Sequence, residues 1–173
     1  MSITLILGGA RSGKSARAEN LVQQSGKAVI YVATAPSLKD DDAWQQRIEQ
    51  HRLRRPKAWQ CVEEPLAIAD VLTSYSKKHI ILVDCMTLWL SNLMWKKKPV
   101  DDAVGDLCAT LKRMESDVVM VSNELGMGLV PEHTLSRAFR DEHGRLNQRL
   151  AALSDHVEFV VAGLPMIVKG EKP

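Results

Sequence analysis

A glycine-rich segment near the N-terminus has the residues and spacing of a phosphate-binding loop. Residues 8–15 match the pattern G-x-x-x-x-G-K-[ST], with an apolar run before them and helical spacing after them. In such a loop the backbone amides surround an anion, the lysine reaches the β- and γ-phosphates, and the serine hydroxyl ligates Mg²⁺. The alternative is a glycine-rich turn before an ordinary helix start. We expect a nucleoside triphosphate to contact Gly8, Gly9, Ala10, Arg11, Ser12, Gly13, Lys14 and Ser15.

An acidic residue closes a second apolar run. Asp84 follows residues 80–83, which read Ile-Ile-Leu-Val. A carboxylate at the end of a buried strand can hold Mg²⁺ on the side opposite the loop serine. The alternative is an N-cap for a helix that begins near Met86, because aspartate favours that position. We expect the metal role, with Ser15 and Asp84 as the metal ligands.

A histidine lies among four arginines in residues 47–56. If this segment is helical, Trp44, Ile48 and His51 share one face, so the imidazole points into the fold. A neutral imidazole can attack phosphorus, and neighbouring arginines favour the neutral ring and suit a polyphosphate. From spacing alone, a packing role for His51 and a solvated surface for the arginines stay open.

The elements that must position these residues follow from the apolar pattern. Runs rich in β-branched residues predict strands at 3–7, 28–33, 80–83, 118–121 and 157–162, with a peripheral strand at 58–63. Helical spacing predicts helices at 15–24, 42–52, 66–75, 88–95, 103–114 and 134–153. Strands that are apolar on both faces and alternate with helices predict an α/β fold, with a mostly parallel sheet covered by helices on both faces.

Composition narrows the class of protein. The chain has 173 residues, 45% of them hydrophobic and 25% charged, which predicts one globular domain over residues 1–173. Its net charge of +2 argues against a general nucleic-acid coat. Cys61, Cys85 and Cys108 form no C-x-x-C pair, so neither a disulfide framework nor a zinc site is expected. We find no secretory pattern and no apolar stretch of about 18 residues, so we expect a cytoplasmic protein without stable membrane insertion.

Several segments together resemble the bifunctional adenosylcobinamide kinase/adenosylcobinamide-phosphate guanylyltransferase family. They are the loop at 8–15, Y-V-A-T-A at 31–35, R-I-x-x-H-R-x-x-R-P at 47–56 and V-S-N-E-L-G-M-G-L-V-P at 121–131, followed by F-R-D at 139–141 and G-R-L-N-Q at 144–148. The resemblance covers nearly the whole chain, in order. It implies a RecA-like P-loop NTPase fold, a homotrimer and a role in cobalamin biosynthesis.

The resemblance also implies two reactions. First, a nucleoside triphosphate, GTP or ATP, phosphorylates the aminopropanol hydroxyl of adenosylcobinamide. Second, GMP is transferred from GTP through a guanylylated histidine, giving adenosylcobinamide-GDP and pyrophosphate. The histidine matches His51. The further nucleotide-binding positions that match are Ala33, Thr34, Ala35, Arg52, Leu53, Arg54, Arg55, Glu63 and Asp84.

Two points stay open at the level of the residues. Either Glu63 or Asp84 can serve Mg²⁺ or a guanine edge. The pair Asn123 and Glu124 follows the expected strand at 118–121, at the carboxyl edge where ligands of open α/β sheets gather, which favours contact with substrate. Its alternative is a loop stabilised by turn chemistry.

Two other functions compete with this interpretation. One is an ordinary small-molecule P-loop kinase that uses His51 only structurally. The other is a RecA-like ATPase whose basic segment contacts single-stranded nucleic acid. The second needs aromatic stacking positions, yet aromatic residues make up only 5% of the chain. We therefore expect the partners to be the corrinoid, the nucleotides and further copies of this chain, and no nucleic acid.

Overall fold

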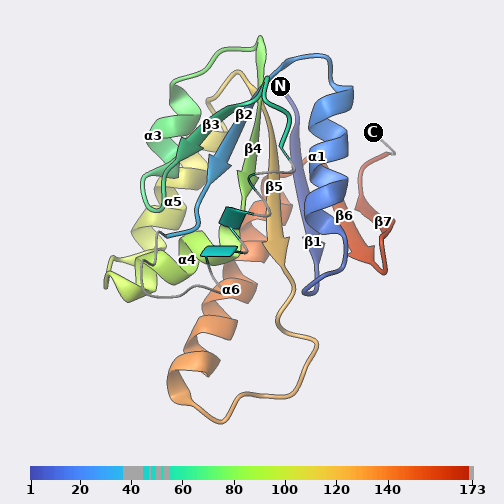
Figure 1. Cartoon of the computed structure of the whole chain (residues 1–173). Helices are drawn as coiled ribbons and strands as arrows, with labels where there is room; N and C mark the ends of the chain where they lie inside the picture. The colour runs from blue at the N-terminus through green and yellow to red at the C-terminus, as the bar shows by residue number, and fades with distance from the viewer. Residues whose placement is uncertain (37–44, 47, 50–51, 53–54, 172–173) are drawn as a thin grey trace.

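Seven strands form one sheet in the computed structural model, which describes residues 1–36, 45–46, 48–49, 52 and 55–171. The strand order is β3-β2-β4-β5-β1-β6-β7, and every neighbouring pair is parallel except β6 and β7 (Figure 1). The strands are β1 Ile3–Gly8, β2 Ala28–Ala33, β3 Gln60–Glu63, β4 His79–Asp84, β5 Asp117–Asn123, β6 His156–Val161 and β7 Leu164–Lys169. The predicted mostly parallel α/β sheet is confirmed, with the peripheral strand at its edge.

The described helices lie close to their predicted positions. They are α1 Lys14–Gln24, α3 Ile68–Thr73, α4 Met86–Trp95, α5 Val100–Leu111 and α6 Thr134–Leu153. The segment predicted as a helix at 42–52 is helical at 45–46, 48–49 and 52, and its other residues lie outside the described part of the chain. Gly144 does not interrupt α6. None of the helices in the described ranges is long and apolar enough to cross a membrane.

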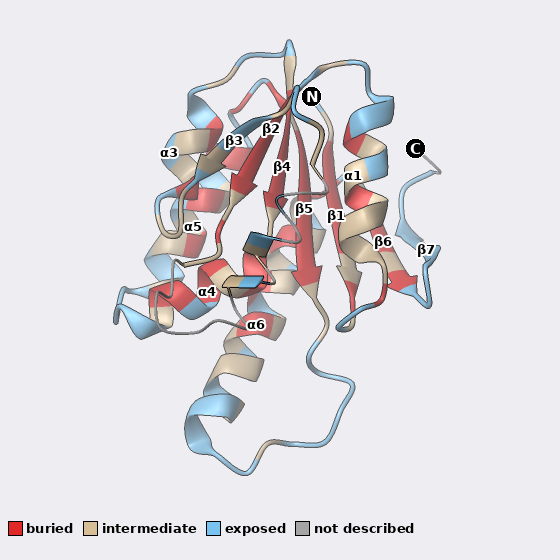
Figure 2. Ribbon diagram, viewed as in Figure 1, coloured by how far each residue is buried: buried red, intermediate tan, exposed pale blue. Residues whose placement is uncertain are grey.

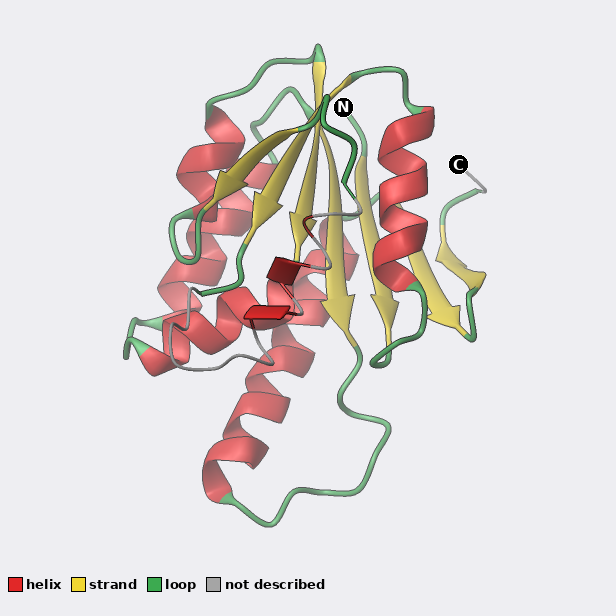
Figure 3. Ribbon diagram, viewed as in Figure 1, coloured by secondary structure: helices red, strands yellow, loops and turns green. Residues whose placement is uncertain are grey.

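Helices cover both faces of the sheet because its central strands are apolar on both faces. In β2, Ile30 and Val32 join a core with α3, α4, α5 and α6, whereas Val29 and Tyr31 join a second core with α1. Figure 3 shows α1 on one face and the other four helices on the opposite face. The central strands are correspondingly buried (Figure 2). This packing fixes the strands rigidly, so residues at their ends have defined positions.

The last strand was not predicted. The apolar run at 157–162 predicts a single strand. In the structure that strand ends at Val161, and the chain reverses into a second strand, β7. Ala162 and Gly163 both have positive φ, 52° and 82°, as a two-residue hairpin turn of type I′ requires. Every residue of β7 is exposed, so it carries no pattern of burial that alternation could reveal.

The parallel register brings five strand ends to one edge. Gly8 at the end of β1 pairs with Asn123 at the end of β5, and Ala33 at the end of β2 pairs with both Asp84 and Glu63. In a parallel sheet, the carboxyl edge is where ligands bind. Glu63, Asp84, Asn123 and the start of the phosphate loop therefore meet there.

Candidate active site

The phosphate loop connects β1 to α1 through a backbone that requires glycine at two positions. A side-chain carbon on Gly8 would lie 2.5 Å from the Ser12 hydroxyl oxygen and 2.7 Å from the Val160 carbonyl oxygen. Gly13 immediately precedes α1 with φ of 96°, a conformation that favours glycine. The hairpin supports the loop, because the Gly163 amide donates to the Ser12 carbonyl at 2.8 Å. The loop thus leads into a helix N-terminus, where the helix dipole favours an anion.

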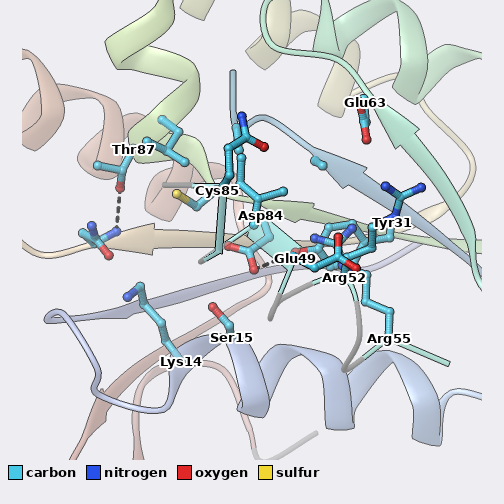
Figure 4. Close-up of a pocket in the computed structure, with 16 residues that line it drawn as sticks. Lys14, Ser15, Tyr31, Glu49, Arg52, Arg55, Glu63, Asp84, Cys85 and Thr87 are labelled. Carbon is cyan, nitrogen blue, oxygen red and sulfur yellow. Dashed lines mark hydrogen bonds between the residues drawn. The ribbon is translucent and has the colours of Figure 1, made fainter. Parts of the chain in front are cut away.

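A pocket of about 440 Å³ opens beside the start of α1. Figure 4 shows Lys14 and Ser15 rising from α1 toward Asp84, with Arg52 and Arg55 beside Tyr31. The lining residues are Lys14, Ser15, Tyr31, Ala33, Ala35, Gln45, Ile48, Glu49, Arg52, Arg55, Glu63, Asp84, Cys85, Thr87, Leu88 and Asn123. The pocket therefore combines cationic side chains with two carboxylates at the ends of β3 and β4.

Tyr31 orients the carboxylate of Asp84. Its hydroxyl donates to Asp84 Oδ2 at 2.9 Å, and the Arg55 guanidinium lies 3.6 Å above its ring, a cation–π contact. Burial, followed by the negative charge of Asp84, raises the pKa of Tyr31, so the hydroxyl stays a donor. The N-cap of α4 is Cys85 and not Asp84, so the capping alternative is absent at this helix.

The side chain of Thr34 is buried behind the pocket and does not line it. Its hydroxyl donates to the Cys85 carbonyl at 2.7 Å and accepts from the Cys85 amide at 2.8 Å, which ties the end of β2 to the start of α4. Burial and the charge of Asp84 raise the pKa of the Cys85 thiol to about 11. Cys85 is therefore a neutral thiol at physiological pH, and it is a poor nucleophile because the thiolate is the attacking form.

A buried polar cluster supports the end of β5. Thr87, Ser122 and Asn147 each lie within 3.4 Å of a ring nitrogen of His143, which is only 1% exposed. Burial lowers the pKa of His143 to about 4, against a smaller opposing effect of Glu124. This histidine of α6 is neutral and hydrogen-bonded. No pattern in the sequence indicates that it contacts Thr87, a residue that lines the pocket.

Ser15 and Asp84 suit Mg²⁺ by their chemistry. Both present oxygen atoms to the same pocket, and Mg²⁺ in nucleotide sites is held by one or two protein ligands together with phosphates and water. The described residues contain no group of three or more histidine, cysteine or acidic side chains that could hold a metal by themselves. The donor set is therefore one that needs a nucleotide to complete it.

The structure brings together only part of the predicted site. Predicted residues that line the pocket are Lys14, Ser15, Ala33, Ala35, Arg52, Arg55, Glu63 and Asp84. Thr34 and loop residues 8–13 do not line it, and the predictions for His51, Leu53 and Arg54 fall outside the described residues. Tyr31 was missed as a lining residue, although its two-residue spacing from Ala33 places both on one face of β2.

Comparison with known proteins identifies close sequence relatives. The model of a family described as cobinamide kinase/cobinamide phosphate guanyltransferase matches residues 4–168. A bifunctional adenosylcobalamin biosynthesis protein, CobP of Pseudomonas aeruginosa, is 48% identical over 170 residues, covering 96% of this chain and 97% of the relative. The protein of the same description in Escherichia coli, CobU, is 38% identical over 181 residues, covering 95% and 98%.

Solved structures with little sequence identity share the fold. The flagellar accessory protein FlaH from Methanocaldococcus jannaschii is 15% identical, with a TM-score of 0.54 over 98% of this chain and 79% of that one. An ATPase of a bacterial type III secretion system is 10% identical, with a TM-score of 0.59 over 96% and 56%. These similarities confirm the expected RecA-like P-loop NTPase fold.

Proposed function

Because the chain belongs to the cobinamide kinase/cobinamide phosphate guanyltransferase family, we propose that one pocket, at the carboxyl edge of the sheet, serves both reactions of that family. The chain is a bifunctional transferase, and the rival interpretation as an ordinary small-molecule kinase is not favoured. The observation that carries the one-pocket proposal is the convergence of Lys14, Arg55 and Asp84 on the same space. A single domain carries the whole site.

In the kinase reaction, the aminopropanol hydroxyl of adenosylcobinamide attacks the γ-phosphorus of GTP or ATP. The new O–P bond forms as the bond from the γ-phosphorus to the β,γ-bridging oxygen breaks, the nucleoside diphosphate leaves, and the hydroxyl proton passes to solvent. Lys14 stabilises the charge on the β- and γ-phosphates. Ser15 and Asp84 hold Mg²⁺, which offsets charge on the phosphate oxygens.

In the guanylyltransferase reaction, we place His51 as the nucleophile. Its imidazole nitrogen attacks the α-phosphorus of GTP, and pyrophosphate leaves. The phosphate of adenosylcobinamide phosphate then attacks the same phosphorus, breaks the P–N bond, and regenerates the histidine. Cys85 is unsuited to this role because its thiol is protonated. Arg52 and Arg55 line the pocket and can offset the negative charge of the triphosphate. We assign the same role to Arg54.

The remaining assignments extend the same proposal. Gly8 through Gly13 hold the phosphates through their backbone, and Ala33, Ala35, Leu53 and Glu63 complete the nucleotide site. Thr34 supports the site from behind through its two hydrogen bonds to Cys85. The corrinoid and nucleotides are the partners, the protein acts in the cytoplasm as a homotrimer, and nucleic acid is not a ligand.

Covalent labelling tests the nucleophile directly. The chain is incubated with α-labelled GTP and Mg²⁺, denatured, and examined for label that is stable to alkali and labile to acid, as a phosphoramidate is. We expect label on the parent and on a His133→Gln control, where the exchanged histidine is exposed, and none on His51→Ala. If His51→Ala acquires the same label, the nucleophile lies elsewhere.

A further inference from the structure

Side chains from two helices hold the backbone of Asn123 on both sides. Its amide donates to Thr87 Oγ1 of α4 at 2.9 Å, and its carbonyl accepts from Asn147 Nδ2 of α6 at 2.9 Å. Strand pairing alone leaves the last residue of a strand free to vary in direction. Here both backbone groups are held by side chains, so the direction in which the Asn123 side chain leaves the backbone is fixed as well.

A second layer of hydrogen bonds fixes the two side chains that hold Asn123. Ser122 Oγ donates to Asn147 Oδ1 at 2.7 Å, and His143 Nε2 lies 3.0 Å from Thr87 Oγ1. Ser122 is 0% and His143 1% exposed. Polar groups buried this deeply give up hydration, and apolar side chains would fill the same space without that cost. The cluster therefore contributes directional restraint, which apolar packing does not provide.

The restrained residue occupies the middle of the carboxyl edge. β5 lies between β4, which ends at Asp84, and β1, which leads into the phosphate loop. Asn123 pairs with Gly8 and lines the pocket together with Lys14 and Asp84 (Figure 4 shows the hydrogen bond that Thr87 accepts). A carboxamide is uncharged, so it can donate to phosphate oxygens beside Lys14 without adding a charge next to Asp84.

We infer that Asn123 contacts the γ-phosphoryl group of the bound nucleoside triphosphate, and that Thr87, Ser122, His143 and Asn147 are positioning residues that aim it. This inference rests on the nucleotide site of the proposed function. Negative charge on the γ-phosphoryl oxygens is spread further in the transition state of transfer, and a donor already aimed there stabilises it without reorganisation.

Paired affinities test the contact. Binding of the β,γ-imido analogue of GTP and of GDP is measured by calorimetry with the full chain and Mg²⁺. Asn123→Ala is expected to lower the affinity for the analogue about tenfold or more, as for loss of a hydrogen bond to a charged group, and to leave the affinity for GDP unchanged. Equal affinities of parent and variant for the analogue overturn the contact. If the parent binds neither nucleotide, the proposed function fails, and this inference fails with it.

Two buried serines test the positioning role. Ser122→Ala removes the hydrogen bond to Asn147 of α6. Ser154→Ala removes another buried hydrogen bond, at the C-terminal end of α6, from Ser154 Oγ to the Leu150 carbonyl at 2.8 Å. A merely structural role predicts similar losses of melting temperature and unchanged nucleotide discrimination for both. We expect Ser122→Ala to lower the ratio of analogue to GDP affinity by about threefold, in the range of a neutral hydrogen bond, and Ser154→Ala to leave it unchanged. Equal ratios in the two variants overturn the positioning role.

Discussion

Lowering the pH should destabilise the fold through His143. The pKa of this buried histidine falls from 6.5 to about 4, whereas in the unfolded chain it has its ordinary value. Between pH 6.5 and about pH 4, His143 is protonated in the unfolded state and neutral in the folded state. The free energy of unfolding therefore falls with falling pH, by about 1.4 kcal/mol per pH unit. From full stability above pH 6.5, the loss at pH 4 is about 3 kcal/mol.

Guanidinium unfolding at pH 7 and pH 4 measures this loss. His143→Gln removes the titrating group, so its stability should fall by about 3 kcal/mol less than that of the parent between the two values. His133→Gln, at an exposed position, serves as the control and should follow the parent. If His143→Gln does not fold, the ring is titrated by NMR in the parent. Equal pH dependence in parent and variant, or a ring that titrates near 6.5, would refute the reasoning.

Three further predictions follow from single contacts. Asp84→Asn should fold normally yet lose kinase activity in a steady-state assay, since it removes the charge and keeps a side-chain oxygen that can accept the hydrogen bond from Tyr31; normal activity would contradict the metal role. Gly8→Ala should weaken GTP binding measured by calorimetry, because its new carbon would lie 2.5 Å from the hydroxyl oxygen of Ser12. An affinity equal to that of the parent would show that the loop adjusts freely. Glu158→Gln should lower stability in urea by about 3 kcal/mol, because Glu158 is 2% exposed and accepts two bonds from Arg17 at 2.7 and 2.8 Å; a change below about 1 kcal/mol would mean the pair contributes little.

The sequence predicted those parts of the structure that depend on local pattern. Apolar runs marked the central parallel strands, because both of their faces are buried. The phosphate loop was recognisable because its residues follow a short local pattern, in which Gly8 approaches Ser12 and Gly13 has a positive φ just before α1. Asp84 was located by its place at the end of a strand, and in the structure it lines the pocket.

Residues that act through distant partners escaped prediction. His143 meets Thr87, 56 positions away, and Tyr31 meets Asp84, 53 positions away, so neither pairing leaves a periodic signal. β7 was not predicted because it is exposed along its whole length and its pairing depends on positive φ at Ala162. Long-range hydrogen bonds and turn geometry become visible only once the strands are ordered.

Guanylylation by a Lys14→Ala variant most directly tests whether one pocket serves both reactions. The folded variant is supplied with adenosylcobinamide phosphate, GTP and Mg²⁺, which bypasses the kinase step, and adenosylcobinamide-GDP is measured by chromatography. If the phosphate loop holds the triphosphate for both reactions, no such product should form above background. Formation at the rate of the parent protein would contradict the account and would place guanylyl transfer at a second site.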